Sequence, residues 1–228
     1  MQDTQPKIRV MGDRSLLVEL GDGISREVNQ RVRRLYCTLT EHKLGGVIEL
    51  IPGYATLLVI FDPLRTSLSA LKTAIARAVE TVASAPIAKP RTVRIPVAYG
   101  GAFGPDLTWL AEFHHLTPDE VIRHHSSTTY QVYMIGFIPG FPYMGEVPVE
   151  IAAPRRSTPR THVPQGSVAI AQRQTGIYPA ASPGGWQIIG RTPFRLFDPA
   201  TFPPTPLEPG DLVTFYAIER KAFDAWQP

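Results

Sequence analysis

Arginine, glutamine and aromatic residues alternate with glycine and proline from Tyr130 to Asp198, a combination suited to recognising anions and amides. Arginine can grip a carboxylate or phosphate through two parallel hydrogen bonds, and glutamine can hydrogen-bond an amide. Aromatic side chains can wall a small planar ligand, while glycine lets backbone amides approach it closely. The alternative is that the arginines pair with acidic side chains and the aromatic residues fill a small barrel. The residues concerned are Arg155, Arg156, Arg160, Gln174, Thr175, Tyr178, Gly184, Gly185, Trp186 and Arg191.

Several common catalytic motifs are missing from the sequence. It has no G-x-x-x-x-G-K-S/T phosphate loop, no G-x-S-x-G nucleophile elbow and no histidine or cysteine cluster with zinc spacing. The histidines at 114–115 and 124–125 are adjacent, so their side chains point about 100° apart on a helix and neither pair suits one metal ion. We therefore expect solvated or packing histidines and no metal site. Because no catalytic carboxylate is obvious, we expect a site completed by another chain.

Composition indicates a globular chain without a membrane span. The 228 residues are 43% hydrophobic, no apolar run approaches the roughly 20 residues that a span requires, and the N-terminus lacks the layout of a secretion signal. The single cysteine, Cys37, excludes an internal disulfide and fits a reducing cytoplasm. A net charge of +3 is too small to indicate nucleic-acid binding. We expect a cytoplasmic protein that binds neither membrane nor nucleic acid.

The first 88 residues predict a small α/β domain. Ser25 can cap an amphipathic helix over residues 26–41, and Ser67 can cap a second helix. From Ser15 the order is strand, helix, strand, strand, helix, strand, the split βαβ pattern of ferredoxin-like domains. A proline-containing linker at 83–90 places the domains at 1–88 and 89–228, with the strand at 92–98 assignable to either. The expected strands are 7–11, 15–20, 47–51, 56–61 and 92–98.

The remainder of the chain predicts two short helices followed by an all-β domain. Asp106 is expected to cap the first helix, and Thr117 to Glu120 forms a capping box for the second. Beyond Tyr130, short apolar segments are separated by glycine and proline turns, which predicts a barrel or half-barrel of short strands. These segments are 132–135, 167–171, 187–189, 192–197 and 211–216.

A series of longer motifs resembles the KipI/PxpB family. The main ones are Gly136-Phe-x-Pro-Gly-Phe-Pro-Tyr143, Pro-Arg-Arg156, Pro-Arg160, Val-Pro-x-Gly-Ser167, Gln-Thr-Gly-Ile-Tyr-Pro179 and Ser-Pro-Gly-Gly-Trp186. Gly12-Asp-Arg-Ser-Leu-Leu-Val, Ile51-Pro-Gly-Tyr and Pro96-Val-Ala-Tyr-Gly-Gly resemble the family's earlier motifs, so the resemblance spans nearly the whole chain. This family includes the B component of bacterial ATP-dependent 5-oxoprolinase. It has also been called allophanate hydrolase subunit 1, and it corresponds to part of the carboxyltransferase region of urea carboxylase.

The resemblance implies an α+β chain with a small N-terminal domain and a cyclophilin-like β-barrel domain. It implies a C-type partner subunit with a related β domain and an A-type subunit, which with this chain hydrolyse the lactam 5-oxo-L-proline to L-glutamate with cleavage of ATP. We expect ATP to be bound by or shared with a partner subunit, and this chain to be inactive alone. The best catalytic candidates are then Arg160, Arg191 and Gln174. The substrate-binding candidates are Phe141, Tyr143, Arg155, Tyr178, Gly184, Gly185 and Trp186.

Two alternative functions stay open. One family branch inhibits a sporulation histidine kinase, and the aromatic segment from Phe137 to Met144 could serve such docking. The other alternative is a component of urea or allophanate metabolism of the carboxyltransferase type. The 228 residues contain no biotin-attachment sequence and no carboxylase ATP-grasp segment, so this chain does not run that chemistry alone.

Overall fold

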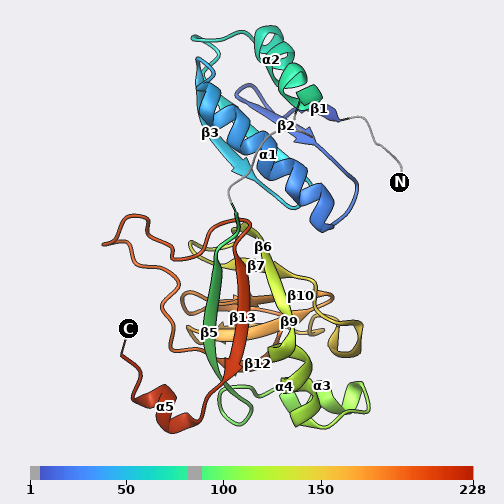
Figure 1. Ribbon diagram of the computed structural model, residues 1–228, viewed down its shortest axis with the longest axis vertical. Helices are drawn as coiled ribbons and strands as arrows, with labels where there is room; N and C mark the ends of the chain where they lie inside the picture. Colours follow the sequence, from blue (N-terminus) through green and yellow to red (C-terminus); the bar gives the residue numbers. More distant parts are fainter. Residues whose placement is uncertain (1–5, 82–88, 228) are drawn as a thin grey trace. The chain divides into compact units, whose positions relative to one another are not determined.

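The chain divides into two compact units, Met1–Lys89 and Pro90–Pro228 (Figure 1). The computed structural model describes residues 6–81 and 89–227. The expected domain boundary at residue 88 and most of the expected linker at 83–90 lie outside these ranges. Each unit has its own hydrophobic core. In the described ranges, no helix is both long enough and apolar enough to cross a membrane.

The first unit is a four-stranded antiparallel sheet with two helices on one face (Figure 1). Alternate strand residues such as Leu16 are buried against apolar helix residues such as Leu35 and Ile75. Ser25 caps the first helix as expected, since its hydroxyl accepts a hydrogen bond of 3.2 Å from the N–H of Val28. The elements are β1 (Lys7–Val10), β2 (Ser15–Glu19), α1 (Arg26–His42), β3 (Val47–Pro52), β4 (Thr56–Phe61) and α2 (Leu68–Thr81).

The strand order of this sheet, β1-β2-β4-β3, corrects one part of the predicted topology. The strand expected to complete the split βαβ pattern is β5 (Thr92–Tyr99), and it belongs to the second unit. There Ile95 and Val97 enter the barrel core, and β5 pairs in parallel with β13 (Leu212–Ala217). β1 takes the edge position beside β2 instead. The α+β class and the ferredoxin-like layering of helices on one sheet face are confirmed.

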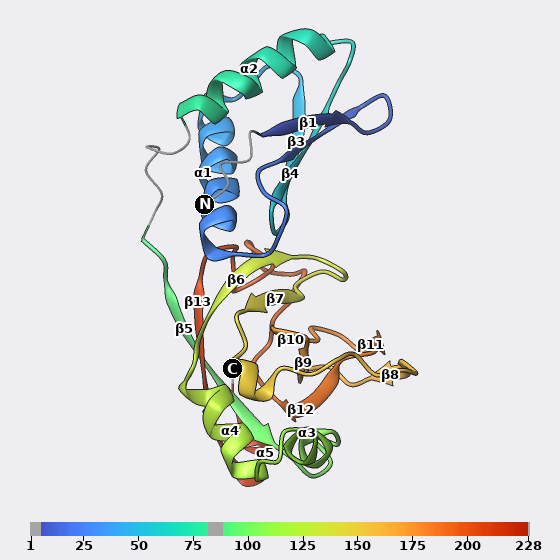
Figure 2. The same ribbon diagram turned by 90° about the vertical axis from the view of Figure 1, so that its right-hand side faces the viewer.

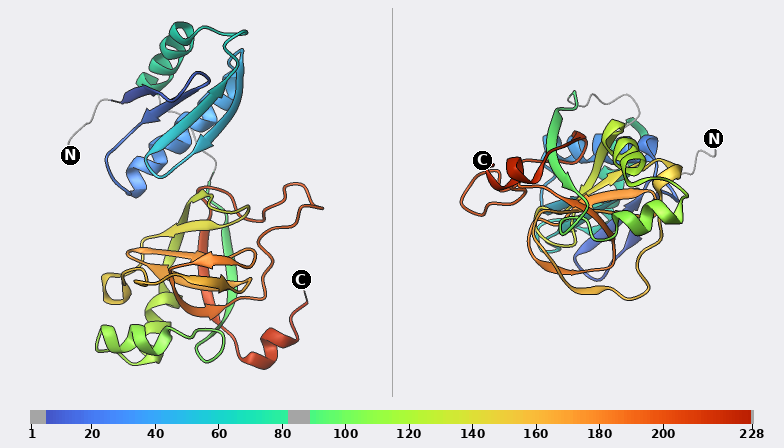
Figure 3. Two further views of the ribbon diagram at one scale, coloured as in Figure 1. Left: turned by 180° about the vertical axis from the view of Figure 1, so that it is seen from behind. Right: turned by 90° about the horizontal axis from the view of Figure 1, so that it is seen from below.

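The second unit is a closed barrel of seven strands in the order β10-β7-β6-β13-β5-β12-β9 (Figure 3). β5 and β13 run parallel, and the other neighbouring strands run antiparallel. Every strand contributes apolar side chains to the interior, so the barrel expected from the short apolar segments is confirmed. Its remaining strands are β6 (Thr129–Ile135), β7 (Pro142–Gly145), β9 (Ser167–Ala171), β10 (Gln174–Ile177) and β12 (Gln187–Arg191).

Several short elements lie outside the barrel strands (Figure 2). The capping box expected before the second helix is present: Thr117 Oγ1 accepts from the N–H of Glu120 at 3.3 Å, and the Glu120 carboxylate accepts from the N–H of Thr117 at 2.8 Å. Two short strands pair with each other and form no part of the barrel. These elements are α3 (Leu107–Phe113), α4 (Pro118–Ser127), the 3-10 helix η2 (Val149–Ile151), β8 (Arg160–Val163), β11 (Ser182–Gly184) and α5 (Arg220–Asp224).

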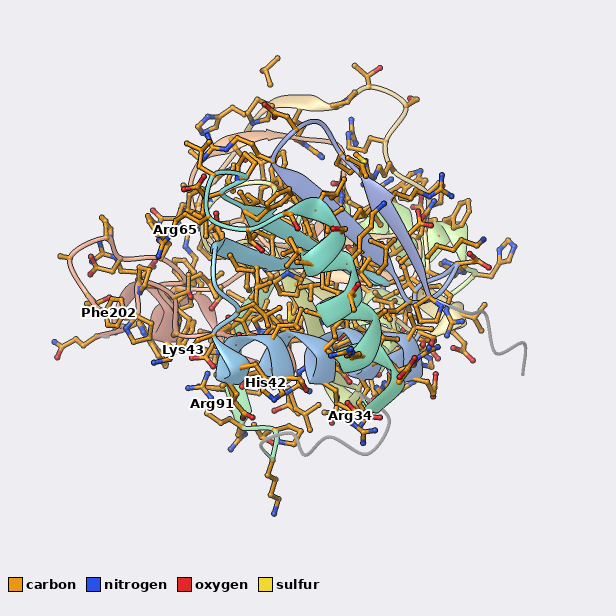
Figure 4. All side chains as sticks on the ribbon, turned by 90° about the horizontal axis from the view of Figure 1, so that it is seen from above. Arg34, His42, Lys43, Arg65, Arg91 and Phe202 are labelled. Carbon is orange, nitrogen blue, oxygen red and sulfur yellow. The ribbon has the colours of Figure 1, made fainter. Side chains whose placement is uncertain are left out.

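Two local predictions are wrong. Asp106 precedes α3 but makes no capping hydrogen bond, because its carboxylate faces arginine side chains instead. Residues 192–197 form no strand. Pro193 has no N–H to donate to a neighbouring strand, and this segment begins the long connection from β12 to β13. The same connection carries Phe202, which is 99% exposed (Figure 4).

Candidate functional site

The candidate site lies on the outer face of the barrel, over strands β7, β9, β10 and β12. Side chains alternate along a strand, so Val168 and Ile170 point into the barrel while Ala169 and Ala171 point outward. A small apolar cluster covers the outward-facing residues and is separate from the barrel core. Its larger members are Phe141, Val163, Tyr178, Trp186 and Ile188.

Four of the predicted aromatic residues, Phe141, Tyr143, Tyr178 and Trp186, contact one another and form what we call the aromatic cluster. The ring centroid of Phe141 lies 4.8 Å from Tyr143, 5.1 Å from Tyr178 and 5.5 Å from Trp186. Tyr143 and Trp186 are 5.8 Å apart, and the pairs with Trp186 are edge-to-face. Tyr143 is partly exposed and the other three are buried. Such packing fixes the ring orientations, so the partly exposed Tyr143 ring is held in place by three buried rings.

The two predicted glycines lie against this cluster in different ways. A Cβ on Gly184 would lie 2.7 Å from Cζ of Tyr178, so the Tyr178 ring packs directly on the glycine backbone. A Cβ on Gly185 would make an ordinary contact of 3.5 Å with Pro159. Burial raises the pKa of Tyr178, and a hydrogen bond between its hydroxyl and the Trp186 main chain opposes the rise. Close packing therefore requires glycine at 184 but not at 185.

Arg155 lies at the aromatic cluster and is exposed. Its guanidinium carbon is 6.0 Å from the centroid of the Trp186 ring. Burial raises the pKa of Tyr143, and the positive charge of Arg155 opposes that rise; the same charge also acts on Tyr178. Within residues 6–81 and 89–227 Arg155 pairs with no carboxylate. Its charge is therefore available to an anion.

Arg156 and Arg160, in contrast, both pair with Asp106. Arg160 donates from Nη1 to Oδ2 at 2.9 Å and from Nη2 to Oδ1 at 2.8 Å, and Arg156 donates from Nη1 to Oδ1 at 3.1 Å. The N–H of Ile188 donates to Oδ2 at 2.7 Å. These two arginines therefore pair with an acidic side chain, which was the alternative to ligand binding that the sequence left open. Sequence reasoning missed Asp106, although one signal was present: residues 151–197 contain six arginines and no acidic residue, so a partner had to come from elsewhere.

The other two catalytic candidates lie in different places. Gln174 is on the outward face of β10, and the pairing with β7 puts it diagonally opposite Tyr143. Arg191, at the end of β12, donates from Nε to the carbonyl of Gln165 at 2.7 Å and lies 5.8 Å from the Phe223 ring centroid. Neither of these contacts belongs to the aromatic cluster. Gln174 therefore adjoins the aromatic cluster, whereas Arg191 contacts Gln165 and Phe223.

His125 points into the barrel. Its Nδ1 is 2.7 Å from the Tyr99 hydroxyl and its Nε2 is 3.0 Å from the Thr175 hydroxyl. Because Thr175 donates to the carbonyl of Ala169 at 3.0 Å, it accepts from Nε2, and Nδ1 accepts from Tyr99. Burial lowers the pKa of His125 to about 3, so the ring is neutral near pH 7. His125 is thus a packing histidine, as expected, whereas Thr175 lies inside the barrel and not at the ligand site.

The arrangement is suited to binding a small planar anion. Tyr143 offers a partly exposed ring, Gln174 lies beside it, and Arg155 offers an exposed positive charge. The carboxylate of Asp106 is already paired with Arg156 and Arg160. Across the part of the chain that the structure describes, no three histidine, cysteine, aspartate or glutamate residues are grouped to hold a metal ion.

Comparison with known proteins gives three relatives of note. The chain is 40% identical to the B component of 5-oxoprolinase from Bacillus subtilis, over 97% of this chain and 96% of that protein. It is 42% identical to the B component of 5-oxoprolinase from Escherichia coli O157:H7, over 90% of this chain and 93% of that protein. It is also 25% identical to urea amidolyase of Saccharomyces cerevisiae, over 98% of this chain but only 14% of that protein.

Solved structures share the fold. The crystal structure of TTHA0988 matches with a TM-score of 0.79 and 36% identity, covering 90% of this chain and 40% of that chain. The conserved uncharacterized protein PH0987 from Pyrococcus horikoshii matches with a TM-score of 0.57 and 46% identity, covering 95% of this chain and 100% of that chain. Residues 6–207 match the family described as carboxyltransferase domain, subdomain C and D. The chain therefore belongs to this carboxyltransferase-domain family and, within it, to the family of 5-oxoprolinase B components.

Proposed function

We propose that this chain is the B component of an ATP-dependent 5-oxoprolinase, which hydrolyses 5-oxo-L-proline to L-glutamate while ATP is cleaved to ADP and phosphate. It acts in the cytoplasm with a C-type subunit that has a related β domain and with an A-type subunit, and it is inactive alone. ATP is a co-substrate, bound by or shared with a partner subunit.

The observation that carries this proposal is the position of Arg155 at the aromatic cluster. 5-Oxo-L-proline is a small lactam ring that bears one carboxylate. The partly exposed ring of Tyr143, which packs on the buried Trp186, offers apolar surface to the lactam, and the exposed Arg155 guanidinium offers a partner for the carboxylate. The similarity to two proteins named as 5-oxoprolinase B components supports this choice of substrate.

Each candidate residue then has a proposed role. Gln174 hydrogen-bonds the lactam amide from the outward face of β10. ATP activates the lactam by phosphorylating its amide oxygen, and positive charge beside the ring stabilises the negative charge that develops there. Arg191 is a candidate for stabilising this negative charge. Turnover of the complex with Arg191→Ala tests that role. Arg160 has a structural role, since both of its terminal nitrogens donate to Asp106 and so fix β8 to the segment before α3.

The test is 5-oxoproline-dependent release of phosphate from ATP. It is run with this chain alone, with its C-type partner, and with the C-type and A-type partners together. We expect turnover only in the complete mixture. A complete complex that assembles and yet has no turnover on 5-oxoproline would refute the proposal.

A urea-related amide is the second candidate substrate. It is favoured by the similarity to urea amidolyase and by the match to a carboxyltransferase family. The same mixtures are therefore assayed with urea and with allophanate, and turnover on either one without turnover on 5-oxoproline would replace the first proposal. The kinase-inhibitor alternative is tested separately by histidine-kinase autophosphorylation, and no inhibition at micromolar concentrations of this chain would exclude it.

A further inference from the structure

The carboxylate of Asp106 is fully occupied by donors from three other segments of the chain. Both terminal nitrogens of Arg160 donate to it at 2.9 and 2.8 Å, Nη1 of Arg156 donates at 3.1 Å, and the N–H of Ile188 donates at 2.7 Å. The Asp106 side chain is only 6% exposed. A carboxylate has about four lone-pair sites, so this one has little capacity left to accept from a ligand.

Asp106 thereby divides the three arginines of the site into distinct kinds. Arg160 donates to Asp106 from both terminal nitrogens, so the fork between Nη1 and Nη2 is occupied. Arg156 gives only Nη1, and its buried Nε has no hydrogen-bond partner among the described residues. Arg155 gives nothing to Asp106 and lies over the Trp186 ring. Nε of Arg156 is covered by other protein atoms, so the exposed charge of this segment is that of the neighbouring Arg155.

The main chain links this network to the aromatic cluster. The N–H of Arg156 donates to the carbonyl of Gly185 at 2.8 Å, and Gly185 immediately precedes Trp186. Arg160 is paired in register with Gly184 across β8 and β11, and its charge acts on Tyr178. A movement of residues 155–160 would therefore move both the Arg155 guanidinium and the backbone that supports the rings.

We propose that Asp106 is the positioning residue of this site and that it positions Arg155 to receive the carboxylate of the substrate. This rests on the proposed function, because it names the group that the same site binds. Asp106 touches no substrate atom. It holds residues 155–160 on β12 through a buried charge pair whose forked geometry fixes both arginines. A carboxylate can accept two parallel hydrogen bonds from one guanidinium, and the exposed Arg155 can supply them.

The test compares Asp106→Asn with a matched control, Asp211→Asn, in the assembled complex. Asp211 is also a buried aspartate in a forked pair: Arg91 donates from Nε at 3.1 Å and from Nη2 at 2.6 Å, and the N–H of Glu208 donates at 2.9 Å. Arg91 immediately precedes β5 (Figure 4), and neither Arg91 nor Asp211 belongs to the aromatic cluster. Both variants lose one buried charge, so stability alone does not separate them.

For Asp106→Asn we expect the KM for 5-oxoproline to rise about 10-fold or more, with kcat within about threefold and the KM for ATP unchanged. Asp211→Asn should leave both KM values within about twofold despite a similar loss of thermal stability. An equal rise in the KM for 5-oxoproline in both variants, or no rise in Asp106→Asn, would overturn the proposal. A rise confined to the KM for ATP would overturn the assignment of a substrate carboxylate.

Amide hydrogen exchange on the full chain separates this proposal from the proposed function. Asp106→Asn should accelerate exchange in residues 155–160 and 185–188, whereas Asp211→Asn should not. If the wild-type complex has no turnover on 5-oxoproline, the proposed function is refuted. The exchange rates of Asp106→Asn still test whether Asp106 positions residues 155–160. Unchanged exchange at 155–160 in Asp106→Asn refutes the positioning role even if the wild-type complex is active.

Discussion

Asp106 and Arg160 face each other through two parallel hydrogen bonds, Nη1 to Oδ2 at 2.9 Å and Nη2 to Oδ1 at 2.8 Å. Asp106 precedes α3 and Arg160 begins β8, so the pair fastens two segments that are 54 residues apart. The side chains are 6% and 24% exposed. Water therefore screens this pair poorly, and each charge depends on the other.

Arg160→Ala should lower the free energy of unfolding by about 3 kcal/mol, because it leaves a buried carboxylate with fewer donors. Urea unfolding followed by circular dichroism measures this change. Arg9→Ala is the control, since the Arg9–Glu19 pair has side chains 62% and 26% exposed and should contribute less than about 1 kcal/mol. If both variants lose a similar amount of unfolding free energy, the Arg160–Asp106 pair does not contribute more to stability than an exposed pair does.

Gly184→Ala and Gly185→Ala should differ although the two glycines are adjacent. The new methyl group at 184 would press on the Tyr178 ring, so we expect a loss of about 1–3 kcal/mol and a shift of the β8–β11 pair. At 185 the methyl group meets Pro159 at an ordinary distance, so the loss should stay within about 0.5 kcal/mol. Thermal unfolding of both variants checks this order, and equal stability would contradict it.

Stability should fall in mild acid because His125 is buried and neutral. Its pKa is about 3 in the folded chain, against an ordinary value of 6.5. Between these values the unfolded chain binds a proton that the folded chain excludes. The stabilising contribution is therefore complete above about pH 6.5 and is lost toward about pH 3, at about 1.4 kcal/mol per pH unit.

Urea unfolding from about pH 7 to about pH 5 measures this slope, since His125→Phe removes the titrating group and should flatten the curve by up to about 1.4 kcal/mol per pH unit relative to wild type, with the full effect toward about pH 5. The control is Val121→Ala, because Val121 is also buried on α4 and carries no titrating group, so the slope should match that of wild type. The prediction fails if His125→Phe and wild type have the same slope.

The helices could be predicted because their signals are local. Ser25 and the box from Thr117 to Glu120 lie within one turn of the helices that they cap. The pairing of β5 with β13 joins strands from opposite ends of the second unit, and no local pattern specifies it. The order of elements alone therefore assigns β5 to the wrong sheet.

The candidate site likewise has residues that a local motif predicts and residues that only the folded chain identifies. The aromatic residues and Arg155 stand in a dense motif, and the fold brings them together. Asp106 was missed because Arg156 and Arg160 are 50 and 54 residues away along the chain, and an aspartate before a helix is most simply interpreted as a cap. Thr175 was misplaced because only the strand pairing shows that it points into the barrel.

The most direct test of the proposed function is steady-state kinetics of the reconstituted complex with Arg155→Ala. The matched control is Arg94→Ala, because Arg94 is also exposed and its guanidinium carbon lies 5.0 Å from the centroid of the Tyr216 ring, elsewhere on the barrel. We expect Arg155→Ala to raise the KM for 5-oxoproline about 10-fold or more, with unchanged thermal stability and complex assembly. Arg94→Ala should behave like wild type. An unchanged KM in Arg155→Ala would contradict the assignment of the aromatic cluster as the substrate site.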